Sequence, residues 1–185
     1  GVNQSILISG ESGAGKTEAT KQCLKFLAGI AGSESNVEEK ILVANPLLEA
    51  FGNAKTIRNI NSSRFGKWME VYFDVTTSKM VGSQLFDYLL ERSRVVTQQS
   101  NERNYHIFYE LCQDRDTIAE YGLEPPSNFN YLNQSGCIEV PEIDDAESFQ
   151  EVKDAMERLE FTEEERQNII QLTAAVLFLG NVEFQ

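Results

Sequence analysis

Cysteine and histidine are scarce in this chain of 185 residues, which has three cysteines and one histidine. Cys23, Cys112 and Cys137 are widely spaced and odd in number, a pattern that fits neither a disulfide framework nor a zinc site. No apolar run reaches membrane-spanning length, and the first residues lack the charged and apolar segments of a secretion signal. We therefore expect an intracellular protein with reduced thiols and no transmembrane segment.

Positive charge is also in short supply, because 16 lysines and arginines stand against 29 aspartates and glutamates, for a formal net charge of −13. This acidity disfavours a general role in binding nucleic acid or anionic lipid, whereas binding a nucleotide needs only a local positive site. The hydrophobic content of 41% and the charged content of 24% are typical of a globular protein.

A glycine-rich loop near the N terminus carries the strongest functional signal. Ile6–Ile8 has the pattern of a short buried strand, residues 10–17 have the form Gly-x-x-x-x-Gly-Lys-Thr, and residues 18–27 favour a helix. Strand, loop and helix in this order predict a P-loop, in which Lys16 meets the β- and γ-phosphates and Thr17 binds Mg²⁺. The alternative is a glycine turn before an amphipathic helix, and the match at all four fixed positions disfavours it.

Residues 59–67, Asn-Ile-Asn-Ser-Ser-Arg-Phe-Gly-Lys, form a second polar segment. Its amides and hydroxyls could bond to their own backbone in turns. They could also supply a second Mg²⁺ ligand, donors to the γ-phosphate and a group that positions water. The P-loop elsewhere in the chain favours this second interpretation.

Two further residues have competing interpretations. Asp74 follows the apolar run Val71–Phe73, as the Mg²⁺-binding aspartate of a Walker B segment does, but it could equally end a strand and form a turn. The turn fits a hairpin of residues 68–74 and 80–90. His106, the only histidine, is expected to be a packed core residue and not a catalytic base.

Helical patterns fill most of the remaining chain. Between residues 37 and 51 apolar side chains recur at steps of three and four, and Pro46 should bend this helix or start it afresh. The final helix has Thr162 as N-cap, Glu165 as its capping-box partner and Gly180 as its end. The helices expected in the second half cover residues 105–111, 149–159 and 163–179.

Several segments together resemble the myosin motor domain. Residues 10–18, Gly-Glu-Ser-Gly-Ala-Gly-Lys-Thr-Glu, resemble the P-loop of this family down to its Glu-Ser-Gly-Ala interior, and residues 59–67 are similar to its switch I loop. Residues 47–56 and 102–109 also match, and the similarity continues through essentially the whole chain.

The resemblance implies an α/β fold with a P-loop NTPase-type mixed central sheet flanked by helices, followed by a mainly helical region. Residues 1–100 would hold the P-loop, switch I and the central-sheet strands, and residues 101–185 would form the upper actin-facing region. The chain would be an incomplete motor domain, namely an N-proximal fragment of the motor. The family's purine-binding loop, its switch II segment Asp-Ile-x-Gly-Phe-Glu, its lower actin-binding half, its converter and its lever do not occur in the sequence.

The resemblance also implies ATP and Mg²⁺ as cofactors and assigns site residues. Lys16 would neutralise the phosphates, and Thr17 and Ser63 would coordinate Mg²⁺. Ser62 would position the attacking water, and Arg64 would pair with a glutamate of switch II. The nucleotide-binding positions would be Gly10, Glu11, Ser12, Gly13, Ala14, Gly15, Lys16, Thr17, Glu18, Asn59 and Ser63, and the catalytic ones Lys16, Asn59, Ser62 and Arg64.

In this family switch II supplies the acid beside Mg²⁺, so the resemblance removes that role from Asp74. Ile60 departs from the family pattern, in which Asp or Asn is common at this position.

The implied function is an actin-based motor ATPase of the cytoplasm and cytoskeleton, with light chains or calmodulin bound outside this chain. A non-motor P-loop kinase or small GTPase is one alternative, disfavoured because no Asn-Lys-x-Asp guanine-binding segment is present. The other is a non-catalytic binding module, because the chain by itself could bind nucleotide weakly or not at all.

Overall fold

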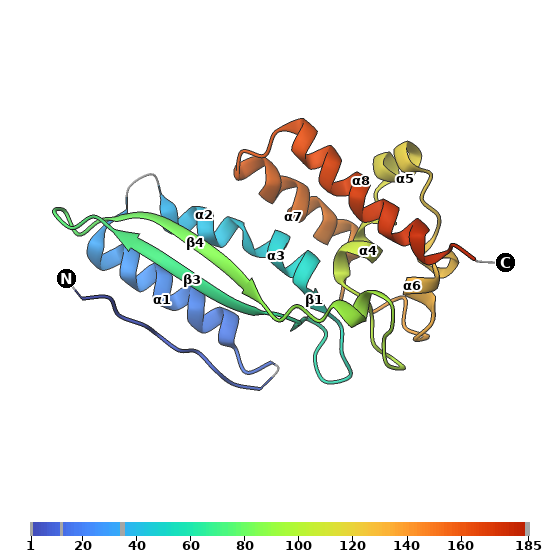
Figure 1. The fold of residues 1–185 in the computed structure, drawn as a ribbon, viewed down its shortest axis with the longest axis horizontal. Coiled ribbons are helices and arrows are strands. Elements are labelled where there is room, and N and C mark those ends of the chain that lie inside the picture. The colour runs from blue at the N-terminus through green and yellow to red at the C-terminus, as the bar shows by residue number, and fades with distance from the viewer. Residues whose placement is uncertain (1, 12, 34–35, 184–185) are drawn as a thin grey trace.

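A computed structural model describes residues 2–11, 13–33 and 36–183. Figure 1 shows a long β-hairpin beside helix α1 at one end of the molecule and a cluster of helices at the other. The elements are, in chain order, α1 (Lys16–Ala31), α2 (Val37–Val43), α3 (Asn45–Gly52), β1 (Asn53–Ala54), β2 (Ser62–Ser63), β3 (Gly66–Phe73), β4 (Met80–Tyr88), η1 (Arg92–Val95), α4 (His106–Leu111), α5 (Arg115–Tyr121), η2 (Pro126–Asn128), α6 (Asn130–Asn133), α7 (Asp145–Arg158) and α8 (Glu163–Gly180).

The predicted hairpin is confirmed. Strands β3 and β4 pair antiparallel, from Gly66 opposite Tyr88 to Phe73 opposite Met80. Asp74 forms the turn, because its Oδ1 accepts hydrogen bonds from the backbone N–H of Thr76 at 3.0 Å and of Thr77 at 2.7 Å. The turn-forming interpretation of Asp74 is therefore correct.

The predicted helix boundaries near Pro46 and Thr162 are also confirmed. Helix α2 ends at Val43, and α3 begins afresh with Pro46 in its first turn, where the missing N–H of proline costs no helical hydrogen bond. Helix α8 begins with the full capping box, in which the Thr162 side chain accepts from the Glu165 N–H and the Glu165 side chain accepts from the Thr162 N–H.

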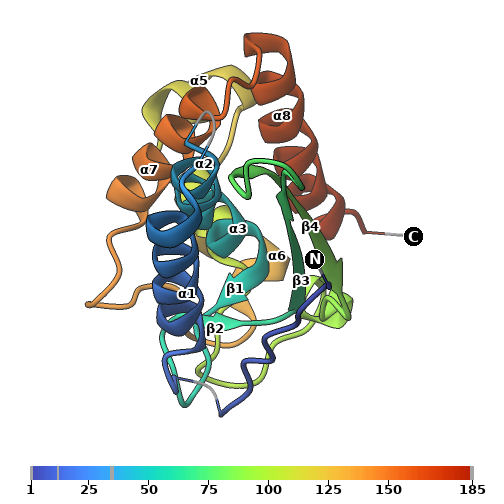
Figure 2. The same ribbon diagram turned by 90° about the vertical axis from the view of Figure 1, so that its left-hand side faces the viewer.

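The hydrophobic core lies in the helical half. All six residues of α4 are buried, and α4 packs against α3, α7 and α8. Figure 2 shows α7 and α8 in this half, away from α1. Burial of a large apolar side chain stabilises a fold by about 1.5–3 kcal/mol, so this cluster anchors the chain on both sides of α4. Its most deeply buried members include Tyr109, Leu111, Phe129, Leu132, Phe149, Met156 and Leu177.

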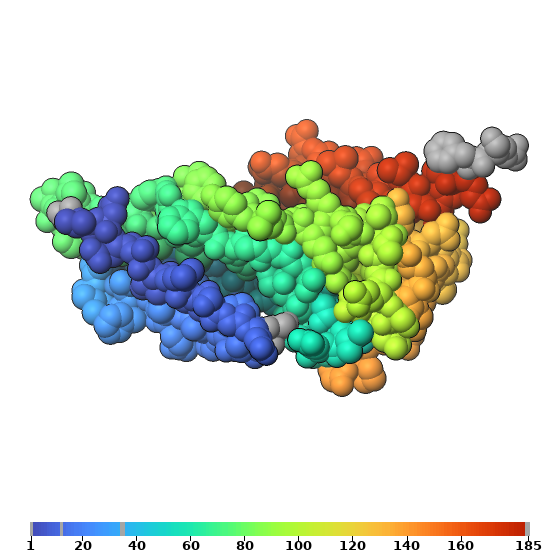
Figure 3. All heavy atoms as spheres, turned by 60° about the horizontal axis from the view of Figure 1, so that its bottom comes forward, coloured from blue at the N-terminus to red at the C-terminus, as the bar shows by residue number. Residues whose placement is uncertain are grey.

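The described residues do not form the expected mixed central sheet. They contain two separate two-stranded antiparallel sheets, β1 with β2 and β3 with β4. The strand expected at Ile6–Ile8 is absent from the described residues, and the Leu7 side chain is 90% exposed. A buried strand needs hydrogen-bonding neighbours and a covering layer, whereas Figure 3 shows this segment lying on the surface beside α1.

No helix in the described part of the chain is long and apolar enough to cross a membrane.

Candidate nucleotide site

The loop before α1 turns tightly at its glycines. Gly13 and Gly15 both have a φ of 82°, a left-handed conformation that glycine adopts without strain. The N–H of Ala14 donates to the carbonyl of Glu11 at 3.2 Å, which closes a turn. At Gly10 an added Cβ would lie only 3.2 Å from the Cβ of Ala14, so the loop folds back tightly there.

Lys16 and the start of α1 concentrate positive charge at this loop. The Lys16 ammonium donates to the carbonyls of Gly10 and Glu11, each at 2.7 Å, and is thereby held across the loop. The N-cap of α1 is Gly15, which offers no side-chain oxygen to the first N–H groups of the helix. Unpartnered helical N–H groups, the helix dipole and a nearby ammonium together favour an anion such as phosphate.

Three other predicted loop residues have less defined surroundings. Thr17 and Glu18 are exposed in the first turn of α1, and Glu18 accepts a hydrogen bond from Gln22 at 3.0 Å on the same helix. That bond directs the Glu18 carboxylate along the helix. Ser12 lies outside the described residues.

Asn59 makes the turn contacts that its residue type favours. Its Nδ2 donates to the Asn61 carbonyl at 3.3 Å, and its Oδ1 accepts from the Asn61 N–H at 3.0 Å. The same Nδ2 also lies 3.8 Å from the position of a Cβ placed on Gly13. The structure therefore brings the 59–67 segment directly against the phosphate loop, although the two are over forty residues apart in sequence.

Asn61 is an anchor of this segment that sequence analysis did not single out. Its Oδ1 accepts from Asn53 Nδ2 at 2.9 Å and lies 3.3 Å from His106 Nε2, and its Nδ2 donates to Glu49 Oε2 at 2.8 Å.

The expected burial of His106 is confirmed. Burial, assisted by the charge of Arg103, lowers the pKa of His106 to about 4, so the imidazole is neutral at physiological pH.

The two serines of β2 differ in exposure. Ser62 is buried and its Oγ accepts from Arg64 Nη1 at 3.2 Å. Ser63 is exposed, and its Oγ donates to the Phe65 carbonyl at 3.1 Å. Because this bond uses the proton of the hydroxyl, the oxygen lone pairs of Ser63 are directed elsewhere and suit a hard cation such as Mg²⁺.

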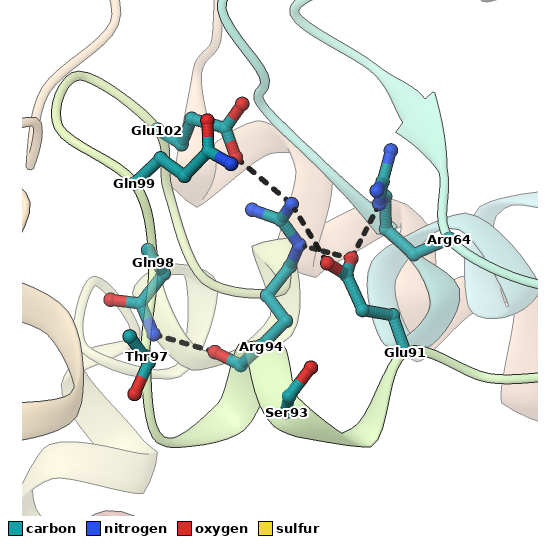
Figure 4. A pocket seen from close by; sticks show the side chains of 8 residues that line it. All are labelled: Arg64, Glu91, Ser93, Arg94, Thr97, Gln98, Gln99 and Glu102. Atoms are coloured by element: carbon teal, nitrogen blue, oxygen red, sulfur yellow. Dashed lines mark hydrogen bonds and ion pairs between the residues drawn. The ribbon is translucent and has the colours of Figure 1, made fainter.

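Arg64 has an ion-pair partner within the chain that sequence analysis missed. Its Nε lies 2.6 Å from Glu91 Oε2, and the same oxygen lies 2.7 Å from Arg94 Nε. Arg94 continues to Glu102 at 2.9 Å. Figure 4 shows Arg64 and Arg94 meeting the Glu91 carboxylate from two sides, at the wall of an open cavity of about 290 Å³.

This alternating network connects two points of the backbone at residues 59–67, which we call the second loop. Glu102 Oε1 accepts from the N–H of Ile57, just before the loop, at 3.3 Å, and Arg64 lies within the loop. Burial opposes ionisation of Glu91, but the hydrogen bonds from Arg64 and Arg94 outweigh it and lower the Glu91 pKa. The carboxylate is therefore charged at neutral pH and holds both arginines.

The turn between β3 and β4 lies at the far end of α1 from the phosphate loop (Figure 1). The hairpin turn that contains Asp74 ends at Met80, whose N–H donates to Gly32, directly after α1, at 3.0 Å. A 16-residue helix thus separates Asp74 from Lys16, so the Walker B interpretation is wrong.

The whole chain, residues 1–185, matches the family model described as Myosin head (motor domain). The chain belongs to the myosin motor-domain family. It is 52% identical over 189 residues to Myosin-14 of Arabidopsis thaliana, which covers all of this chain and 12% of that protein. It is 49% identical over 190 residues to the Myosin ID heavy chain of Dictyostelium discoideum, which covers all of this chain and 17% of that protein.

A fungal relative, Myosin-1 of Aspergillus clavatus, is 46% identical over 188 residues, which cover 98% of this chain and 15% of that protein. This chain therefore spans about a sixth or less of the length of these three myosins. The match gives no support to the alternative of a kinase or small GTPase.

Proposed function

We propose that this chain forms one side of the nucleotide site of an actin-based motor ATPase. The observation that carries the proposal is the contact between Gly13 of the phosphate loop and Asn59 of the second loop. A switch of this type needs one loop that holds the phosphates and a second that responds to the γ-phosphate. Membership of the myosin family and the geometry of both loops support ATP as the nucleotide.

In the proposed site Lys16 and the amides of residues 13–16 bind the phosphates of ATP. Binding would require the Lys16 ammonium to leave the carbonyls of Gly10 and Glu11, to which it now donates. Thr17 and Ser63 would hold Mg²⁺, which would neutralise the negative charge that develops on the phosphates. The remaining loop positions, Gly10, Glu11, Ser12 and Glu18, would shape the loop.

The second loop would contribute position and charge at the γ-phosphate. Asn59 would donate to a phosphate oxygen, and Ser62 would orient the attacking water. Arg64 would close the site against a glutamate outside this chain, exchanging its contact with Glu91. Catalysis in this class of reaction depends mostly on such positioning and charge stabilisation.

We further propose that residues 1–100 belong to the nucleotide-binding part of the motor and residues 101–185 to its helical, actin-facing part. The exposed apolar side chains of Ile6, Leu7 and the hairpin support completion of a central sheet by other strands. A two-stranded hairpin is only marginally stable by itself. The same proposal implies cytoskeletal localisation, movement along actin, and light chains or calmodulin bound outside this chain.

The test is nucleotide turnover by the full-length protein with and without actin filaments. We expect hydrolysis of ATP in preference to GTP, strict dependence on Mg²⁺ and stimulation by actin. A preference for GTP, or turnover that actin leaves unchanged, contradicts the proposal. The non-catalytic alternative is tested by equilibrium binding of ATP to this chain by itself. We expect the isolated chain to bind ATP at most, without turnover.

A further inference from the structure

A second cavity, of about 320 Å³, lies between α3, α4 and α7. One wall is apolar and includes Ile60 and Val152. The polar lining is strongly acidic and includes Glu49, Glu110, Glu142, Asp144, Glu147 and Glu151. Among the described residues that line this cavity, none is a lysine or an arginine.

Two buried side chains of α4 leave acceptor atoms without partners at this cavity. His106 Nε2 faces the Asn61 oxygen, so the ring proton sits on Nε2 and Nδ1 is left as an acceptor. Neither His106 Nδ1 nor Glu110 Oε2 has a hydrogen-bond partner. The two residues are only 6% and 3% exposed and lie one helical turn apart on one face of α4.

A buried polar atom without a hydrogen-bond partner costs about 1–3 kcal/mol, so two in one cavity indicate a missing partner. Arg103, whose charge acts on both residues, donates to neither of these two atoms, and its own Nε and Nη1 are also without a hydrogen-bond partner. Its Nη2 contacts both carboxylate oxygens of Asp145, at 2.8 and 2.9 Å, and its guanidinium stacks 3.7 Å from the centre of the Tyr109 ring.

We propose that this cavity binds a small organic cation, an ammonium, amidinium or guanidinium group on a compact apolar body. The N–H groups of the cation would supply the donors that Glu110 and His106 lack, with only a local turn of these side chains. The acidic rim would attract the charge, and the wall at Ile60 and Val152 would cover the apolar body. The volume suits a ligand of this size.

The ionisation of Glu110 provides a distinctive signature. Burial and the neighbouring carboxylates of Asp145 and Glu151 raise its pKa to about 8, against the opposing charge of Arg103. A cation prefers the ionised form, so binding must displace this proton at neutral pH. The affinity should therefore rise roughly tenfold between pH 7 and pH 9.

An occupied cavity would also affect the nucleotide site, and this extension rests on the proposed function. Ile60 and Asn61 line the cavity and belong to the second loop, and Asn61 is bonded to Asn59. A bound cation would hold this segment in place beside the phosphate loop. Direct binding, measured without nucleotide, does not depend on that extension.

The test is calorimetric titration of the full-length protein with benzamidine, using benzamide as the neutral analogue. We expect binding of benzamidine only, with an affinity that rises with pH. Glu110→Gln should weaken it roughly tenfold to a hundredfold, because a charge-assisted hydrogen bond is lost. Glu164→Gln, an equal charge change on an exposed residue of α8, should leave the affinity unchanged.

A second pair of variants keeps the test independent of Glu110. Ser148 lines the cavity from α7, so Ser148→Lys should place a tethered cation there and abolish benzamidine binding, whereas Ser148→Ala should preserve it. Equal binding of benzamide, equal losses in the Glu110 and Glu164 variants, or full binding by Ser148→Lys overturns the proposal. ATP turnover in the Lys16→Ala variant tests the proposed function separately. Benzamidine binding should remain intact in this variant whether or not turnover is lost.

Discussion

Glu91 is predicted to determine the local stability of the second loop, and Glu91→Gln tests this directly. The substitution keeps the shape of the side chain but removes the charge that Arg64 and Arg94 share at 2.6 and 2.7 Å. Arg94 is only 4% exposed and would keep a single carboxylate partner, Glu102. The amide that replaces the carboxylate also points an N–H₂ donor at two guanidinium groups, which are donors themselves.

The expected cost follows from these contacts. A hydrogen bond to a charged group contributes about 1.5–3 kcal/mol, and Glu91 makes two short ones. Since Glu91 is 32% exposed, solvent screening reduces their sum to roughly 2 kcal/mol for opening of the segment. Amide exchange that proceeds through this opening should then be roughly 30-fold faster in the variant.

Hydrogen–deuterium exchange of the full-length protein measures this effect. The informative amides are those of Ile57, Arg64 and Glu91, which bond to Glu102, Gly52 and Arg64 respectively. Glu120→Gln on the exposed face of α5 is the matched control and should change nothing at these amides. Exchange within twofold of wild type at all three would refute the argument that Glu91 holds the loop.

The pH dependence has a definite sign. The Glu91 pKa is lowered in the folded protein, so its contribution is present above the ordinary glutamate pKa and is lost as the pH falls through the lowered value. The difference between wild type and Glu91→Gln should accordingly shrink as the solution becomes more acidic.

Three further substitutions separate the loops from the scaffold. Gly13→Ala should impair ATP binding more than folding, because φ is 82° there and Asn59 Nδ2 lies 3.8 Å from the new Cβ. Nucleotide titration measures the binding, and circular dichroism measures the folding. Asp74→Ala should weaken the hairpin slightly, because the turn loses its hydrogen bonds to Thr76 and Thr77, and should leave actin-stimulated ATPase activity intact. A loss of Mg²⁺ dependence would restore the Walker B assignment. Gly52→Ala should destabilise the fold by about 1–3 kcal/mol and lower the unfolding midpoint, because the new Cβ would lie only 2.1 Å from Phe65 Cε1. An unchanged midpoint would show that Phe65 moves freely.

The features predicted correctly from the sequence depend on residues close together in the chain. The capping box of Thr162 and Glu165 spans four residues, and the turn at Asp74 bonds to Thr76 and Thr77. Short-range geometry of this kind depends on backbone angles and local donors, which residue type largely determines. The same reasoning gave the restart of the helix at Pro46.

The features that sequence reasoning missed join distant positions. Arg64 and Glu91 are 27 residues apart, and Asn61 and His106 are 45 apart. An arginine has many glutamates to choose from in an acidic chain, so composition does not select its partner. The strand expected at Ile6–Ile8 failed for a related reason, because an apolar run forms a strand only when neighbouring strands are present.

Turnover by the Lys16→Ala variant tests the central claim most directly. The ammonium of Lys16 is the fixed positive charge of the phosphate loop, held by the carbonyls of Gly10 and Glu11. Actin-stimulated hydrolysis of ATP by the full-length protein should be abolished in Lys16→Ala. It should be retained in Lys21→Ala, a control on the next turn of α1. Actin-stimulated turnover that survives in Lys16→Ala would contradict the assignment of this loop as the nucleotide site of a motor.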